Sequence, residues 1–307
     1  MHFIKVFVIG SLNMDLVVTT KTYPEQGETV IGESFFVNPG GKGANQAVAI
    51  SKMGARVEMV GVVGQEFGRE LISSLKDYKV STKYVRKNKE ISSGTAIIIV
   101  QNGDNRIILN PSANFDFKKA DVDRALKSAK PGDILLTQIE IPIEIVEYAL
   151  KKGKQLGMIT FLNPAPAAKI ADDVFQYIDY FLPNQIEAQL YTEIFPNDLS
   201  DAKKCAQKLL KKGVKNVLIT LGDKGSYFLN ANLEHHSLPY NVMTVDTTGA
   251  GDTYIGTFLT AIAEKRSIIE AMKIASLAAS IMIQRLGAQK AIPHRKEIEK
   301  VLKEYEN

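Results

Sequence analysis

A glycine-rich segment in the last quarter of the chain carries the residues best suited to chemistry. Residues 245–256 read VDTTGAGDTYIG and lead into an apolar stripe of helical spacing. The stripe consists of Ile255, Phe258, Leu259 and Ile262. Backbone amides at the start of a helix hold anionic oxygen, so we expect an anion site where Gly249 and Gly251 let the backbone N–H groups turn toward one point. Asp252 beside it could accept the proton of an alcohol, as phosphoryl transfer to a hydroxyl group requires. In the simpler alternative, Asp252 or Thr253 only caps the helix.

A second glycine-rich segment lies near the N-terminus. Residues 39–49 read PGGKGANQAVA, which predicts a loop that opens a helix and lacks the GxxxxGK[ST] spacing of a P-loop. Glycines let a ligand approach the backbone closely, and the Asn45 side chain offers both a donor and an acceptor. A plain glycine turn is the alternative for this segment taken alone.

Polar residues follow several of the predicted strands. After the strand at residues 6–10, Asn13 and Asp15 stand where a dinucleotide-binding GxGxxG loop would continue, which disfavours a nicotinamide-dependent dehydrogenase. Four later strands also end in polar segments, at 138–140, 163–166, 183–187 and 221–225. Because ligands in open α/β sheets bind beyond the carboxyl ends of the strands, we expect these segments to meet in one crevice.

Short, alternating apolar groups predict a second, smaller sheet. They lie at residues 16–18, 29–31 and 35–37, and a turn at 102–105 predicts a hairpin. We expect a lid built from two insertions, at about 13–39 and 93–113, with Asn114 at the return to the main domain. One half-exposed face of this lid is expected to present Leu16, Val18 and Ile98, an apolar patch that a second copy of the chain could cover.

Composition limits the classes of function. The 307 residues have a formal net charge of +4 and 45% hydrophobic residues, and their lysines are scattered. This argues against nucleic-acid binding and against a membrane span. Cys205 is the only cysteine, which excludes an intrachain disulfide, and its helical spacing from Leu209 predicts a core position. The chain starts directly with a predicted strand, from which we expect a cytoplasmic protein.

Seven motifs occur in one order along the chain: GSLNMD, GGKGANQA, QIE, NPAPA, PNQIE, LITLGDKG and DTTGAGD. Together they resemble the ribokinase family of carbohydrate and nucleoside kinases over essentially the whole chain. The resemblance implies one domain over residues 1–307. Its fold would be three-layered α/β/α, with a central, mostly parallel sheet flanked by helices and a small β-sheet lid. It also implies transfer of the γ-phosphoryl group of ATP to the 5-hydroxyl of D-ribose.

The resemblance also implies roles for individual residues. Asp252 would be the general base, and Gly249, Ala250 and Gly251 the anion hole. The residues around the sugar would be Asn13, Asp15, Gly41, Lys42, Gly43, Asn45, Glu140 and Asp252. Those along ATP would be Asn184, Thr220, Leu221, Gly222, Asp223, Lys224, Gly225, Gly251 and Ser276.

Metal ions and a homodimer are implied in the same way. Glu187 would hold Mg²⁺ through water. A K⁺ ion would lie near Asp246, Thr248, Met282, Arg285, Gly287 and Ala291. Ala291 departs from the family pattern, which often has serine there. The implied dimer forms through the lid sheets.

Two alternatives stay open. The substrate could be a nucleoside or another sugar, such as deoxyribose. The chain could also be a non-catalytic sugar sensor, although a sensor has no use for the base and glycine loop around Asp252.

Overall fold

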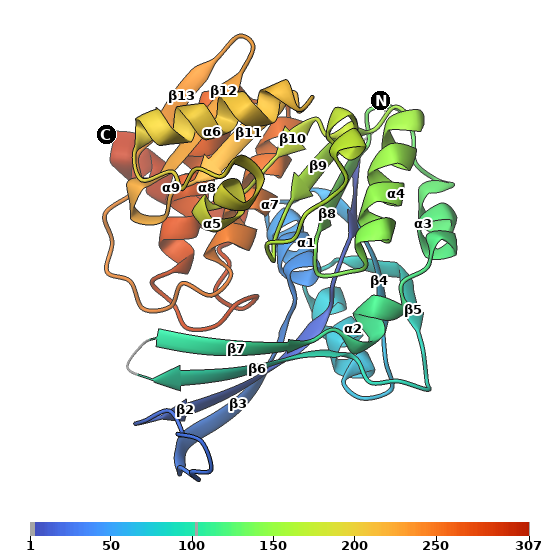
Figure 1. Ribbon diagram of the computed structural model, residues 1–307, viewed down its shortest axis with the longest axis vertical. Coiled ribbons are helices and arrows are strands. Elements are labelled where there is room, and N and C mark those ends of the chain that lie inside the picture. Colours follow the sequence, from blue (N-terminus) through green and yellow to red (C-terminus); the bar gives the residue numbers. More distant parts are fainter. Residues whose placement is uncertain (1–3, 102–103, 307) are drawn as a thin grey trace.

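The computed structural model describes residues 4–101 and 104–306, which form two sheets (Figure 1). The larger sheet has nine strands in the order β13-β12-β11-β10-β9-β8-β1-β4-β5. The seven strands from β11 to β5 in this order run parallel, and β12 and β13 are antiparallel. Their bounds are β1 Lys5–Ile9, β4 Arg56–Val63, β5 Ser81–Lys87, β8 Ile134–Gln138, β9 Ile159–Asn163, β10 Tyr180–Phe181, β11 Asn216–Thr220, β12 Ser226–Asn230 and β13 Glu234–Ser237.

Helices cover both faces of this sheet. One face packs against α3 (Lys119–Leu126), α4 (Ile143–Gln155), α5 (Gln185–Thr192) and α6 (Leu199–Lys211). The other packs against α1 (Lys42–Lys52), α2 (Gly68–Asp77), α7 (Ala250–Ala263) and α8 (Ile268–Met282). The last helix, α9 (Arg295–Glu306), packs on α8. The predicted three-layer fold with a mostly parallel central sheet is confirmed.

Strand β1 illustrates how the two cores form. Phe7 and Ile9 point into the core with α3 to α6, whereas Val6 and Val8 point into the core with α1, α2, α7 and α8. Successive side chains of a strand face opposite sides, so a strand covered on both faces is apolar at every position. Cys205 is fully buried in the first core, as predicted. No helix in the described ranges is long and apolar enough to cross a membrane.

The smaller sheet projects from the main body (Figure 1). Its strands are β2 (Asn13–Thr20), β3 (Gly32–Gly40), β6 (Gly94–Gln101) and β7 (Asp104–Asn110), in the order β3-β2-β6-β7. Both segments in which a second sheet was predicted therefore contribute to it. The strand predicted at residues 29–31 is wrong, because these residues lie in the connection before β3, where Ile31 is 91% exposed. Strands β6 and β7 pair antiparallel, and turn residues Asn102 and Gly103 lie outside the described residues.

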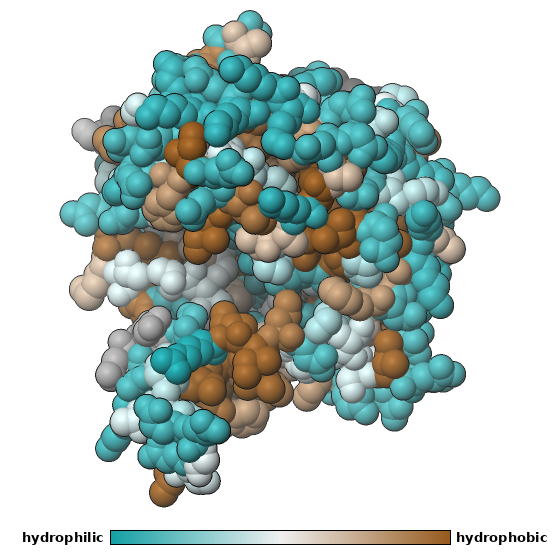
Figure 2. All heavy atoms as spheres, in the orientation of Figure 1, coloured by the Kyte–Doolittle hydropathy of each residue, from teal (hydrophilic) through white to brown (hydrophobic). Residues whose placement is uncertain are grey.

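The register of the smaller sheet corrects one further prediction. Leu16 pairs with Ile97, whereas Ile98 pairs with Val17. Because neighbouring positions of a strand face opposite sides, Ile98 cannot share a face with Leu16 and Val18. Ile98 is instead buried with Val17 and Ala96 in a small cluster. Apolar side chains are nevertheless gathered on this sheet, beside the hollow that separates it from the main body (Figure 2).

Candidate active site

The Asp252 carboxylate is buried at the start of α7, with 7% of the residue exposed. Its Oδ2 accepts a hydrogen bond from Asn45 Nδ2 at 3.0 Å, and its Oδ1 accepts one from Gln46 Nε2 at 2.9 Å. Gly249 is the N-cap residue of α7, and no side chain makes a capping hydrogen bond there. The alternative that Asp252 or Thr253 only caps this helix is therefore wrong.

The approach of α1 to α7 depends on Gly256. A Cβ atom at this position would lie 2.6 Å from the Ala49 Cβ and 2.9 Å from the Gln46 carbonyl oxygen, both on α1. Real Cβ atoms do not come so close, so only glycine allows this crossing. The close crossing brings the side chains of Asn45 and Gln46 to the carboxylate of Asp252.

Gln46 is a site residue that was not predicted. Its Oε1 accepts from Gln138 Nε2 at 2.6 Å, and its Nε2 also donates to Asn163 Oδ1 at 3.0 Å. Gln138 and Asn163 end the neighbouring parallel strands β8 and β9, so the two strand ends fix the orientation of the Gln46 amide. A polar residue that lies within a helix among small apolar residues was the available signal, because a fully buried amide needs partners.

The glycines of the GGKG segment make room for the chain itself. A Cβ at Gly40 would lie 2.2 Å from Asp15 Oδ2, and one at Gly43 would lie 2.6 Å from the Ser11 amide nitrogen. Gly41 has φ +90°, and a Cβ there would lie 2.7 Å from the Asn13 amide nitrogen. The expected close approach to the backbone is thus made by the connection between β1 and β2 and by the start of β2, which carries Asn13 and Asp15. The plain-turn alternative does not account for these contacts.

Glu140 joins several of the predicted sugar-binding residues, and we call Ser11, Asn13, Asp15, Lys42 and Glu140 the Glu140 cluster. Glu140 Oε2 accepts from Ser11 Oγ at 2.5 Å, from Asn13 Nδ2 at 3.3 Å and from the Lys42 amide at 3.1 Å. Its other oxygen, Oε1, makes no hydrogen bond within the described part of the chain. The cluster therefore joins the ends of β1 and β8 to the start of α1 and keeps one carboxylate oxygen available.

Burial and neighbouring charges change the protonation of this site. Burial, Glu140 and Asp252 raise the pKa of Asp15 to about 7, against the opposing effect of Lys42. Burial also raises the pKa of Asp252, although Lys42 and the hydrogen bonds from Asn45 and Gln46 oppose this shift. For Lys42, burial lowers the pKa, but the surrounding carboxylates outweigh burial and the pKa is raised. Lys42 therefore stays cationic among the carboxylates of Asp15, Glu140 and Asp252.

The first turn of α7 carries the predicted anion hole. Gly249 adopts φ +83°, and the Ala250 amide donates to the Thr247 carbonyl at 3.1 Å. The next two amides, of Gly251 and Asp252, lie in the first turn of a helix, where no intrahelical carbonyl is available. A Cβ at Gly251 would have no atom within 4 Å. The geometry thus favours Gly251 as the point of anion approach, while the Ala250 amide already holds the loop.

The predicted nucleotide residues form a neighbouring group. Asn184 and Glu187 make a capping box at the start of α5: Asn184 Oδ1 accepts from the Glu187 amide at 2.9 Å, and Glu187 Oε2 accepts from the Asn184 amide at 2.9 Å. Asn184 also forms a parallel bridge with Thr220, so the ends of β10 and β11 meet there. Burial raises the pKa of Glu187, against the Asn184 hydrogen bond and Lys42. Both residues therefore have a structural role whatever they bind.

The remaining residues predicted to lie along ATP follow β11 or belong to α8. A short 3-10 helix, Gly222–Lys224, leads to Gly225, where φ is +86° and a Cβ would lie 2.0 Å from the Ser237 carbonyl oxygen. Ser276 on α8 lies 3.5 Å from Ser237 between their hydroxyl oxygens, so α8 and β13 border the same region. Leu221 is buried, whereas Gly222, Asp223 and Lys224 are exposed, and Lys224 Nζ donates to the Asn197 carbonyl.

The residues predicted to hold potassium lie in two segments that Asp246 joins. Its Oδ1 accepts from the Thr248 amide at 2.9 Å, and its Oδ2 accepts from the Gly287 amide at 3.0 Å. The Val245 and Asp246 amides both donate to the Ile283 carbonyl. These bonds place residues 246–248 beside residues 283–287, next to the start of α7.

Three of the predicted potassium residues, Met282, Arg285 and Ala291, differ in the contacts that they make. The Met282 carbonyl accepts from the Arg285 amide at 3.0 Å, and the Arg285 side chain pairs with Glu297. Ala291 is buried and has no side-chain oxygen. Within residues 4–101 and 104–306, no group of three or more His, Cys, Asp or Glu side chains is arranged to hold a metal ion.

Known proteins are similar over almost the whole chain. Residues 4–295 match the model of the pfkB family carbohydrate kinases. The chain is 39% identical to the ribokinase of Schizosaccharomyces pombe, over 96% of this chain and 97% of that protein. It is 35% identical to the deoxyribokinase of Salmonella typhi, over 93% and 94%. The structure of Arabidopsis thaliana ribokinase complexed with ribose and ATP has a TM-score of 0.88 at 31% identity and covers 99% of both chains. The chain therefore belongs to the pfkB family of carbohydrate kinases, the family of the ribokinases that it resembles.

Proposed function

We propose that this chain is a ribokinase, which transfers the γ-phosphoryl group of ATP to the 5-hydroxyl of D-ribose. The observation that carries the proposal is the buried Asp252 carboxylate at the N-terminus of α7, held by Asn45 and Gln46. Its charge influences both Asp15 and Lys42, so it lies close to the Glu140 cluster. A base, an anion-binding helix start and a polar cluster thus adjoin one another.

The proposed reaction is an in-line displacement. The 5-oxygen of ribose forms a bond to the γ-phosphorus as the bond from that phosphorus to the β,γ-bridging oxygen breaks. Asp252 accepts the hydroxyl proton, and ADP leaves with the bridging oxygen. The amide of Gly251 and the ammonium of Lys42 are proposed to stabilise the charge on the transferred group. The raised pKa of Asp252 makes its carboxylate a stronger base.

The Glu140 cluster is proposed to recognise the sugar. A polyol needs matched donors and acceptors, and a buried polar group left without a partner costs about 1–3 kcal/mol. Asn13 offers a donor, and Asp15 and Glu140 offer acceptors. The deoxyribokinase relative keeps 2-deoxyribose as the second candidate, since its identity to this chain is nearly that of the ribokinase. A nucleoside is the third.

The nucleotide is proposed to lie along Asn184, residues 220–225 and Ser276. Magnesium would supply positive charge to the phosphates and would be held through water by Glu187. The fit is supported by Glu187: each of its oxygens accepts one hydrogen bond from Asn184 and keeps a further lone pair.

Potassium is proposed beside the anion hole, between the segments that Asp246 joins. Carbonyl oxygens of Thr248, Arg285 and Gly287 suit a monovalent cation. Ala291 can offer only its backbone carbonyl, so the cage would lack a side-chain ligand there. The ion would hold the loop before α7 in place.

A homodimer through the smaller sheet is also proposed. Phe35, Ile97 and Ile108 are exposed by 64%, 42% and 63%, and they belong to the face that carries Leu16 and Val18. Covering these side chains would remove a large apolar area from water. The smaller sheet is proposed to act as the lid, and the cytoplasmic location stays a prediction.

One assay tests the proposal. The purified chain is incubated with ATP and Mg²⁺ and with ribose, 2-deoxyribose or adenosine, each with and without K⁺, and ADP release is measured. We expect the highest kcat/KM with ribose and a gain with K⁺. Preference for adenosine would overturn the assignment, and no turnover with any acceptor would favour the sugar sensor.

A further inference from the structure

Asn114 lies where three segments of the smaller sheet enter or leave the main body. It is 1% exposed and belongs to the 3-10 helix Ser112–Asp116, which follows β7. Its Oδ1 accepts from the Leu12 amide at 2.9 Å, and its Nδ2 donates to the Leu12 carbonyl at 3.2 Å and to Asn13 Oδ1 at 2.7 Å. Asn114 thus holds the start of β2.

Gly94, the first residue of β6, makes room for these bonds. A Cβ there would lie 2.2 Å from Asn114 Nδ2 and 2.3 Å from Asn13 Oδ1. Any larger residue would separate the two amides. The start of β2, the start of β6 and the 3-10 helix after β7 therefore all meet at the pair formed by the Asn13 and Asn114 amides.

The pair fixes the orientation of the Asn13 amide. Asn13 Oδ1 is occupied by Asn114, so its Nδ2 faces Glu140, to which it donates at 3.3 Å. An amide nitrogen has two hydrogens, and one remains for a ligand. Asn13 therefore presents an N–H donor to a hydroxyl bound on the Glu140 side, and a carboxylate oxygen such as Glu140 Oε1 can accept the proton of that hydroxyl.

We propose that Asn114 is a positioning residue for sugar recognition, which acts by holding the Asn13 amide with its nitrogen toward the sugar. This inference rests on the proposed function. It assigns to Asn114 part of the selectivity for a sugar hydroxyl, without direct contact between Asn114 and the sugar.

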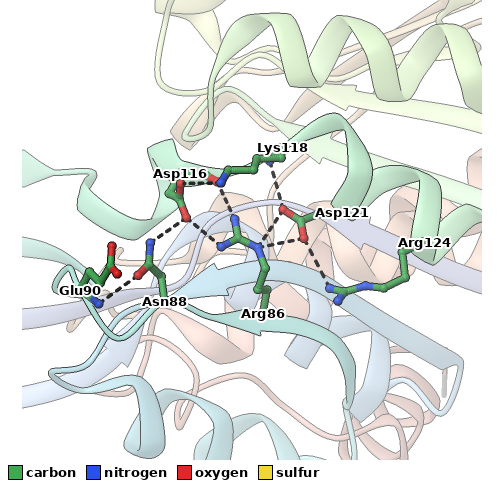
Figure 3. Close-up of polar contacts among 7 residues, drawn as sticks. All are labelled: Arg86, Asn88, Glu90, Asp116, Lys118, Asp121 and Arg124. Carbon is green, nitrogen blue, oxygen red and sulfur yellow. Dashed lines mark hydrogen bonds and ion pairs between the residues drawn. The ribbon is translucent and has the colours of Figure 1, made fainter.

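The far end of the same segment provides a control. Arg86 Nη1 binds Asp116 Oδ2 at 2.7 Å, Arg86 Nε binds Asp121 at 3.0 Å, and Asn88 Nδ2 donates to Asp116 at 2.9 Å (Figure 3). These contacts anchor the 3-10 helix without contacting Asn13. Asn88→Ala therefore weakens the anchoring of the segment but leaves the Asn13 amide in place.

The test uses Asn114→Asp, which keeps the shape and the acceptor for the Leu12 amide. The second carboxylate oxygen lies against Asn13 Oδ1 and repels it. We therefore expect the Asn13 amide to rotate by half a turn, so that its oxygen faces Glu140. We expect the KM for the best sugar of the panel to rise at least tenfold, with the KM for ATP and the kcat at saturating sugar within threefold. Asn88→Ala should leave all three within twofold. Asn114→Ser, which adds no charge, is the second variant and should raise the sugar KM at least threefold.

A double-mutant cycle shows whether Asn114 acts through Asn13. In the Asn13→Ala background, Asn114→Asp should raise the sugar KM by no more than a further twofold. The inference would be overturned if Asn114→Asp raised the sugar KM equally with and without the Asn13 side chain. It would also be overturned if the folded Asn114 variants had an unchanged sugar KM. Circular dichroism and thermal unfolding establish folding. Failure of the proposed function is distinguishable, because it would appear as the wrong preferred acceptor in the unmodified chain.

Discussion

Gln46 Nε2 donates to Asp252 Oδ1 at 2.9 Å, and the Gln46 amide also forms hydrogen bonds with the side chains of Gln138 and Asn163. The orientation of the carboxylate therefore depends on residues at the ends of β8 and β9, which act on it through Gln46. A base at a fixed angle needs less reorganisation during proton transfer, because its donors are already in place.

Replacing Asp252 by asparagine tests the base. Asp252→Asn keeps the side-chain volume but removes the proton acceptor, so kcat should fall by about 10²- to 10⁴-fold. Ribose binding, measured by calorimetry, should change little. Full retained turnover would contradict the role of Asp252.

Gln46→Met tests whether the Gln46 amide orients the Asp252 carboxylate, because it leaves the carboxylate itself unchanged. Methionine has a similar length but no hydrogen bonds, so Gln138 and Asn163 each lose a partner and Asp252 loses one donor. We expect kcat to fall by at least tenfold, and the free energy of unfolding to fall by about 1–3 kcal/mol per unpaired buried group.

The matched control is Gln207→Met on α6, where the glutamine is exposed. Urea unfolding and steady-state kinetics measure both variants. A Gln46 variant with the kinetics of the Gln207 variant would show that the amide does not hold the base in a productive orientation.

Gly251→Ala is informative because the protein leaves space for the new methyl group. No atom lies within 4 Å of the added Cβ, and alanine favours a helix over glycine by about 1 kcal/mol. Thermal unfolding should therefore show equal or higher stability, whereas kcat/KM for ATP should fall at least tenfold if phosphate approaches this amide. Unchanged kinetics would place the transferred group elsewhere.

The pH dependence of stability tests the environment of Asp15. Its pKa is about 7 in the folded chain and 3.8 in the unfolded chain, so the folded chain binds the proton more tightly. The resulting stabilisation is present below pH 4 and is lost as the pH rises through 7, by up to about 1.4 kcal/mol per pH unit. Urea unfolding between pH 5 and 8 should show this slope in the unmodified chain and a flatter one in Asp15→Asn. Parallel slopes would mean that Asp15 is not buried beside other carboxylates.

Much of the fold was predictable because it rests on local patterns. The apolar runs that end in polar residues predicted β8, β9, β10 and β11, and the parallel pairing places their ends at one edge. Glu140 was predicted for the same reason, whereas Asp252 was predicted from the glycine-rich segment before an apolar stripe of helical spacing. Which face of the smaller sheet carries Ile98 could not be predicted, because it depends on the register between β2 and β6.

The residues that were missed act through tertiary contacts. Gln46 carries no motif of its own, and its importance follows from a helix crossing that Gly256 permits. Asn114 was placed at the return from the lid, but its bonds to Leu12 and Asn13 span about a hundred positions. Patterns within one segment cannot report such pairs.

The contact between Asn45 and Asp252 joins positions 207 apart in the sequence. During synthesis, the ribosome must therefore produce most of the chain before α7 can pack against α1. A nascent chain that ends after β11 can already contain the Glu140 cluster, yet it has no carboxylate for Asn45 and Gln46 to hold. Under the role proposed for Asp252, a fragment that ends before α7 lacks the catalytic base.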